Sequence, residues 1–228
     1  MWLDLFLCLL LAHLVADYVL QTNRICENKI EKKWCSLWHY EHALIVAALS
    51  WLVVWDVDFW WYALIIGSTH FMIDMWKSYC KENVVWFVVD QLLHIAVIIG
   101  IAWLWRSTNE WCMPFEFQAK YIALACAVIV CWKPANILIK LMLKHYSVNT
   151  PNGQDDSFNA GALIGNIERW LILLFVILQR YDAIGLLIAA KSIIRFGDSQ
   201  TQKSEYVLAG TLISIFIAVL AGLIVISV

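Results

Sequence analysis

The chain has 228 residues, of which 62% are hydrophobic and 15% are charged. A soluble domain of this size carries about half apolar and about a quarter charged residues, so one globule could not bury this much apolar material. The composition excludes an ordinary cytosolic enzyme and predicts an all-α, polytopic helical membrane protein. The net charge of −2 provides no basic field, so we expect no nucleic-acid partner.

Apolar runs of membrane length, separated by short polar segments, predict about seven or eight transmembrane or membrane-embedded helices. The charged segment 23–33 is expected to be a loop, and 135–145 a more amphipathic piece. Segment 183–196 is open to three interpretations: a short span, a tilted helix or a re-entrant one. The expected helices cover residues 2–21, 38–55, 59–77, 84–105, 117–132, 160–179, 183–196 and 205–228.

One segment rich in Asn, Pro, Gly and Asp divides the chain. We expect a membrane lobe over 1–146, a cytoplasmic loop over 147–159 and a second membrane lobe over 160–228. The seven cysteines are odd in number and form no C-x-x-C pair. A disulfide framework and a thiolate zinc site are therefore not expected.

Basic residues gather in alternate loops, around 24–33, 77–81, 133–144 and 195–203. The opposite loops carry mostly Asp and Glu. Because Lys and Arg favour the cytoplasmic side, we expect a protein integral to the cytoplasmic (inner) membrane. Both termini then lie outside.

Ionisable side chains interrupt the first four predicted spans, although each costs about 2.5–3.5 kcal/mol on insertion. On three of these helices His and Asp stand four residues apart and so share one helix face. Because neighbouring helices run in opposite directions, all these groups fall in the same half of the membrane. The set comprises His13, Asp17, His42, His70, Asp74, Asp90 and His94.

Imidazole and carboxylate groups without thiolate suit a divalent zinc, manganese or iron ion. The seven residues outnumber the ligands of one open catalytic site. Either two metals bind, or one metal binds and the remaining groups orient ligands and move protons. The alternatives are a proton relay or structural His–Asp pairs. Haem fits less well, because it gains nothing from carboxylates.

The second lobe has a polar set of its own. Lys191 and Arg195 are four residues apart and could together hold a phosphate or carboxylate. The alternative is that they reach the lipid headgroups or pair with nearby glutamates. The predicted substrate-binding residues are Lys191, Arg195, Glu168, Arg169, Glu205 and Gln21.

Several motifs resemble a bacterial and phage family of polytopic membrane proteins known as a domain of unknown function. AHLVADYVLQ, THFMID and DQLLH lie in the first lobe, and IERW, AAKSIIRF and EYVLAGT in the second resemble longer members. The resemblance implies a bacterial or phage inner-membrane protein and supplies no activity. A looser, architectural likeness exists to membrane-bound metal-dependent hydrolases, which also set His and Asp at helix ends near the cytoplasm.

These observations lead to a first hypothesis of an intramembrane metal-dependent hydrolase acting on a lipid or lipid-linked substrate near the cytoplasmic interface. Asp17 or Asp90 would act as the catalytic general base. The second hypothesis is a metal-ion or proton transporter or channel that uses the same cluster. The third is a membrane effector with a structural metal site. The expected partner is membrane lipid, and a homo-oligomer remains open.

Overall fold

A computed structural model describes residues 2–109, 118–146, 155–195 and 201–228, with the side chains of 155–160, 194–195 and 201–207 left aside. Within these ranges the structure is helical and holds no strand, which confirms the predicted all-α class. The α-helices are α1 (Trp2–Leu14), α2 (Asn23–Lys32), α3 (Leu37–Val54), α4 (Trp60–Lys77), α5 (Val84–Thr108), α6 (Ala119–Val130), α7 (Lys133–His145), α8 (Asp155–Ile177), α9 (Tyr181–Arg195) and α10 (Thr201–Ser227).

Four helical stretches among the described residues are long and apolar enough to cross a membrane. They are Trp2–Leu20, Leu37–Val54, Val84–Thr108 and Leu208–Ser227. The pair α6 and α7, bent by 41°, would add a fifth if it is one span. The structure thus supports the membrane class, whereas a count of seven or eight spans stays a prediction.

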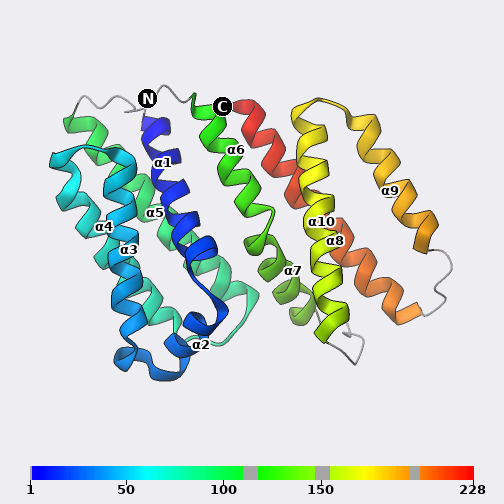
Figure 1. The fold of residues 1–228 in the computed structure, drawn as a ribbon, viewed down its shortest axis with the longest axis horizontal. Coiled ribbons are helices and arrows are strands. Elements are labelled where there is room, and N and C mark those ends of the chain that lie inside the picture. The colour runs from blue at the N-terminus through cyan, green and yellow to red at the C-terminus, as the bar shows by residue number, and fades with distance from the viewer. Residues whose placement is uncertain (1, 110–117, 147–154, 196–200) are drawn as a thin grey trace. The chain divides into compact units, whose positions relative to one another are not determined.

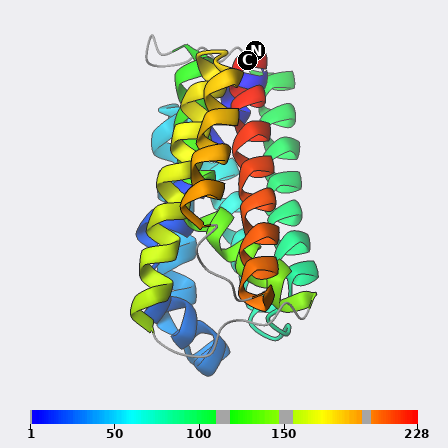
Figure 2. The same ribbon diagram turned by 90° about the vertical axis from the view of Figure 1, so that its right-hand side faces the viewer.

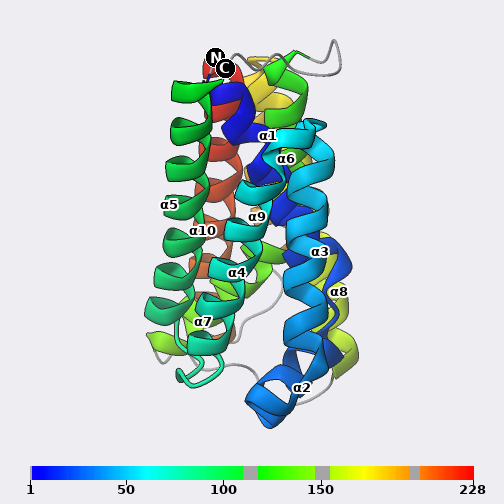
Figure 3. The ribbon, with the colours of Figure 1, turned by 90° about the vertical axis from the view of Figure 1, so that its left-hand side faces the viewer.

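The chain forms two compact units, Met1–Cys126 and Ala127–Val228. In the first unit each of the four long helices packs on two others, in the cyclic order α1, α3, α4, α5. This closes a four-helix bundle, with α2 at one end of it (Figure 1 and Figure 3). Leu5, Phe59 and Trp105 belong to its buried apolar core. The inward-facing sides of the four helices therefore meet along the axis of the bundle.

The segment expected as a loop over 23–33 is instead the helix α2, so that prediction was wrong. Its residues are polar enough for a loop, but none of them breaks a helix. The Ser36 hydroxyl donates a 2.8 Å hydrogen bond to Asn28 Oδ1 and ties the following turn back onto α2. Lys29 is the one α2 residue that is buried. α2 therefore carries a cation into the protein rather than out to solvent.

The first helix widens into a π-helical turn over Val15–Leu20. There the Gln21 N–H donates to the Ala16 carbonyl, five residues earlier, over 3.1 Å. Such turns are rare and occur often at functional sites, because they re-aim side chains within a helix. The turn contains Asp17, one of the predicted site residues.

Gly67 lets α3 and α4 approach each other closely. A Cβ atom built there would lie 2.8 Å from the Ala47 Cβ and 2.9 Å from the Ala43 carbonyl oxygen. Because a backbone atom cannot swing aside, we expect Gly67→Ala to destabilise the bundle by about 1–3 kcal/mol. Thermal unfolding in detergent measures this, with Gly100→Ala as the control because nothing lies within 4 Å of its Cβ position. Equal melting of the two variants would contradict the close approach.

In the second unit α8 packs against α9 and α10, and α10 also contacts α7 (Figure 2). The break between α6 and α7 is followed by Pro134 in the first turn of α7. The predicted dividing loop begins at residues 147–154, which lie outside the described residues. The rest of it, from Asp155, is the start of α8.

Candidate functional site

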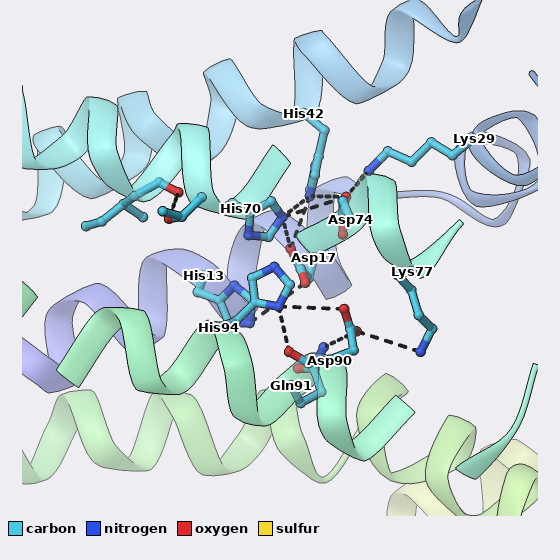
Figure 4. Close-up of polar contacts among 12 residues, drawn as sticks. His13, Asp17, Lys29, His42, His70, Asp74, Lys77, Asp90, Gln91 and His94 are labelled. Atoms are coloured by element: carbon cyan, nitrogen blue, oxygen red, sulfur yellow. Dashed lines mark hydrogen bonds and ion pairs between the residues drawn. The ribbon is translucent and has the colours of Figure 1, made fainter. Parts of the chain in front are cut away.

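The seven ionisable residues predicted from the first lobe come together inside the four-helix bundle (Figure 4). α1 with its widened turn, α3, α4 and α5 each contribute at least one of them. The four histidines are buried, and the three carboxyl side chains are at most 18% exposed. The members of this His/Asp cluster are His13, Asp17, His42, His70, Asp74, Asp90 and His94.

Three atoms of the cluster form a small triangle. His42 Nε2 lies 3.0 Å from His70 Nε2 and 3.1 Å from Asp17 Oδ1, and His70 Nε2 lies 3.5 Å from the same oxygen. Two imidazole nitrogens at this distance need a shared proton or a cation between them. Ligands about 2.0–2.2 Å from a tetrahedral zinc stand roughly 3.3 Å apart, so the triangle has the size of one face of such a site.

Asp74 lies beside the triangle and is held by a lysine. Its Oδ2 is 3.8 Å from His70 Nε2 and 3.9 Å from His42 Nε2. Lys29 Nζ donates to the same oxygen over 2.6 Å. The buried ammonium group thus neutralises Asp74, and the carboxylate can join a metal site only in competition with Lys29.

His94 and His13 each place a ring nitrogen in the interior of the four-helix bundle, next to the triangle. The His94 Nδ1 lies 2.8 Å from the Asp90 backbone carbonyl, so it carries the proton and leaves a lone pair on Nε2. Among the described residues neither that Nε2 nor the buried His13 Nε2 has a hydrogen-bond partner, and the His13 Nε2 lies 3.8 Å from Asp17 Oδ2. A carbonyl bond at one ring nitrogen is the usual arrangement of a metal-binding histidine. Both rings, with His70 and Thr69, line a cavity of about 10 Å³, roughly the space for one water molecule.

Asp90 occupies the other side of this interior. Gln91 donates to its Oδ2 over 3.1 Å, and Lys77 Nζ lies 4.0 Å from the same oxygen. Asp90 Oδ1 is buried, and no residue in the described part of the chain forms a hydrogen bond with it. Suitably placed oxygens and nitrogens of Asp74, Asp90 and His94 all lie within 4.8 Å of one another. The cluster therefore has room for ligands beyond the triangle.

The predicted site leaves out three groups that lie next to the cluster. Lys77 stands three residues after Asp74, a spacing that could have placed it on the same helix face. His39, three residues before His42, is buried, and neither of its ring nitrogens has a hydrogen-bond partner among the described residues. Lys29 gave no signal, because a lysine in a polar segment normally faces water.

The structure describes only some of the predicted substrate-binding side chains of the second unit. Lys191 pairs with Glu168, so its charge is compensated within the protein. The side chains of Arg195 and Glu205 lie outside the described residues. Gln21, in the first unit, is half-buried and makes no hydrogen bond to the cluster among the described residues.

Arg169 is the most buried charged residue of the described second unit, with 1% exposed. Its Nε donates to the Cys131 carbonyl over 2.6 Å, at the break between α6 and α7. Its other nitrogens donate to Ser214 Oγ, Asn136 Oδ1 and Asn166 Oδ1. These four hydrogen bonds connect α8 with α7, α10 and the break between α6 and α7. The nitrogens that form them are thus engaged within the protein.

The fold and site define an all-helical protein with helices of membrane length and a buried cluster of His and Asp in one four-helix bundle. The chain belongs to the DUF3307 family of proteins of unknown function, whose family model matches residues 5–124, just over half of the chain. The matched stretch contains all seven cluster residues and confirms the family resemblance. Searches of curated proteins and of solved structures found no match.

Proposed function

We propose that the His/Asp cluster binds a divalent metal ion and that the protein is a metal-dependent hydrolase of a membrane lipid or lipid-linked substrate. The observation that carries the proposal is the triangle of His42 Nε2, His70 Nε2 and Asp17 Oδ1, with edges of 3.0, 3.1 and 3.5 Å. Three protein ligands with an open fourth position are characteristic of catalytic zinc. Manganese and iron(II) accept the same donors.

The residues around the triangle have separate roles in this proposal. A bound divalent ion activates water for attack and polarises the scissile group. Asp17 serves as a ligand, so Asp90 is the better general base, since its Oδ1 is free to accept a proton from the attacking water. That proton then passes to the oxygen of the leaving alcohol or phosphate as the ester bond breaks. Lys77, whose buried Nζ has no hydrogen-bond partner among the described residues, offsets the negative charge that develops on the substrate.

The same proposal places the site near the cytoplasmic face. α4 packs between α3 and α5, both of which are long and apolar enough to span. We therefore include α4 among about seven or eight membrane-embedded helices, and we count α8 and α9 with them. The basic segments would lie in the cytoplasm and both termini outside. A polar headgroup would reach the cluster from water while its tails remain in lipid.

The function is tested with the full-length protein purified in detergent, loaded with zinc, manganese or iron(II), and incubated with mixed phospholipids. We expect hydrolysis products that require the metal. Asp90→Asn should lower turnover by about 100-fold or more while metal binding is retained, because only the proton acceptor is removed. Asp58→Asn, an exposed carboxylate in the α3–α4 turn, should keep full turnover. Products are measured by mass spectrometry and metal by elemental analysis.

Two outcomes would overturn the proposal that the protein is a hydrolase. One is metal-loaded protein that yields no lipid product. The other is divalent-ion flux into sealed vesicles without lipid turnover, which would assign the same cluster to a transporter.

A further inference from the structure

An apolar groove of about 750 Å³ runs along the outside of α3 and α4. Binding pockets for small molecules have volumes of about 300–1,000 Å³, so the groove is large enough for a chain-like ligand. We call it the α3–α4 groove. Its lining residues are Trp34, Tyr40, Ala43, Leu44, Ala47, Leu64, Gly67, Ser68, Phe71, Met72, Met75, Trp76 and Tyr79.

The sequence explains why a groove forms between α3 and α4. Gly67, Ala43 and Ala47 meet where the two helices approach most closely, and their small side chains form the floor. Larger residues such as Leu44 and Met72 stand beside the floor and are mostly exposed. In a membrane these apolar walls face acyl chains rather than water.

The two ends of the groove differ in chemistry. Contacts between Tyr40 and Phe71 and between Ala47 and Gly67 show that α3 and α4 are antiparallel. Tyr40 and Tyr79 therefore lie at the same end, whereas Leu64 lies in the opposite half of α4. Aromatic residues with polar tips prefer the level of the lipid headgroups. The groove thus changes from aromatic groups with polar tips at one end to apolar residues towards the other.

Cationic and unpaired polar groups stand at the aromatic end. Lys33 Nζ lies 4.1 Å from the centre of the Tyr79 ring, which lines the groove. His39 is buried, its ring nitrogens have no hydrogen-bond partner in the described ranges, and it packs edge-on against Phe71, a second lining residue. A negatively charged headgroup is the complement of this end, and anionic lipid is enriched in the cytoplasmic leaflet.

We propose that the α3–α4 groove binds one acyl chain of an anionic glycerophospholipid, whose headgroup lies at Lys33. Phe71 follows His70 directly and Met75 follows Asp74, so the groove and the His/Asp cluster share the same turns of α4. The lipid bound here is the substrate class of the hydrolase. That last assignment rests on the proposed function, whereas binding in the groove does not.

The experiment uses the full-length protein in detergent with equal amounts of phosphatidylglycerol and phosphatidylcholine of identical chains. Retained lipid is counted by native mass spectrometry. The wild type should retain the anionic lipid over the zwitterionic one by about tenfold. Ser68→Trp, which fills the groove from an exposed position, should lower retention by about tenfold. Lys33→Gln should still bind lipid but lose the headgroup preference.

Ala48→Trp is the matched control, because Ala48 is exposed on α3 and does not line the groove. Equal retention by Ser68→Trp and Ala48→Trp, or no headgroup preference in the wild type, would overturn the proposal. Metal chelation should leave retention unchanged, since the groove contains no cluster residue. Retention without any hydrolysis would therefore count against the hydrolase alone, and hydrolysis without selective retention against the groove alone.

Discussion

Replacing Asp17 with asparagine is expected to lower the affinity for zinc by about 100-fold or more. Changes to residues that merely support metal ligands cost about 10–100-fold. In the proposed site Asp17 would itself be a ligand, because its Oδ1 lies within 3.5 Å of two histidine nitrogens. Asparagine keeps the size of the side chain and removes its charge. Competition with a chromogenic chelator measures the affinity, and circular dichroism checks that the variant is folded.

The control for this experiment is Asp58→Asn, which makes the same chemical change at an exposed position. It should bind zinc as the wild type does. Unchanged affinity in a folded Asp17→Asn protein would remove Asp17 from the metal site. Loss of affinity in both variants would point to a general charge effect and not to the triangle.

Arg169→Met is expected to lower the free energy of unfolding of the second unit by about 3 kcal/mol or more. Hydrogen bonds from a charged donor are worth roughly 1.5–3 kcal/mol each. The substitution leaves the carbonyl of Cys131 and the side chains of Ser214 and Asn136 without this donor. Methionine has a similar length, so packing changes little. Thermal unfolding in detergent, followed by circular dichroism, measures the loss.

Arg180→Met serves as the comparison, because Arg180 is 65% exposed and forms an ion pair with Asp182. An exposed pair of this kind contributes little, so this variant should melt close to the wild type. If Arg169→Met had the same melting temperature as Arg180→Met, the hydrogen bonds of Arg169 would not stabilise the break between α6 and α7.

The positions of the long helices were predictable from hydropathy. Apolar runs end at turns such as 56–59, and the helix boundaries there agree within a few residues with those of α3 and α4. The helix α2 was not predictable from hydropathy. Its segment is polar and rich in basic residues, a pattern that we interpreted as a loop between two spans. The π-helical turn over Val15–Leu20 also left no signal, since its residues suit a regular helix equally well.

Spacing and helix direction predicted that the cluster residues would gather. His70 and Asp74 share a helix face by their four-residue separation, and the antiparallel hairpin brings Asp90 opposite them. What could not be predicted is which atoms touch. Hydropathy carries no information on the rotation of each helix, so the choice of His42 and His70 for the triangle, and the arrival of Lys29 at Asp74, emerge only from packing.

If α6 and α7 are one bent span, the break between them would impose an order on biosynthesis. α6 alone, with 12 residues, is about 18 Å long and cannot cross the roughly 30 Å of a bilayer core. The partner of the Cys131 carbonyl is Arg169 on α8, which leaves the ribosome after both halves of the bent pair. Until α8 inserts, that carbonyl would have no charged donor within the hydrocarbon layer of such a span. The bent pair would then reach its final depth only after the next helix has arrived.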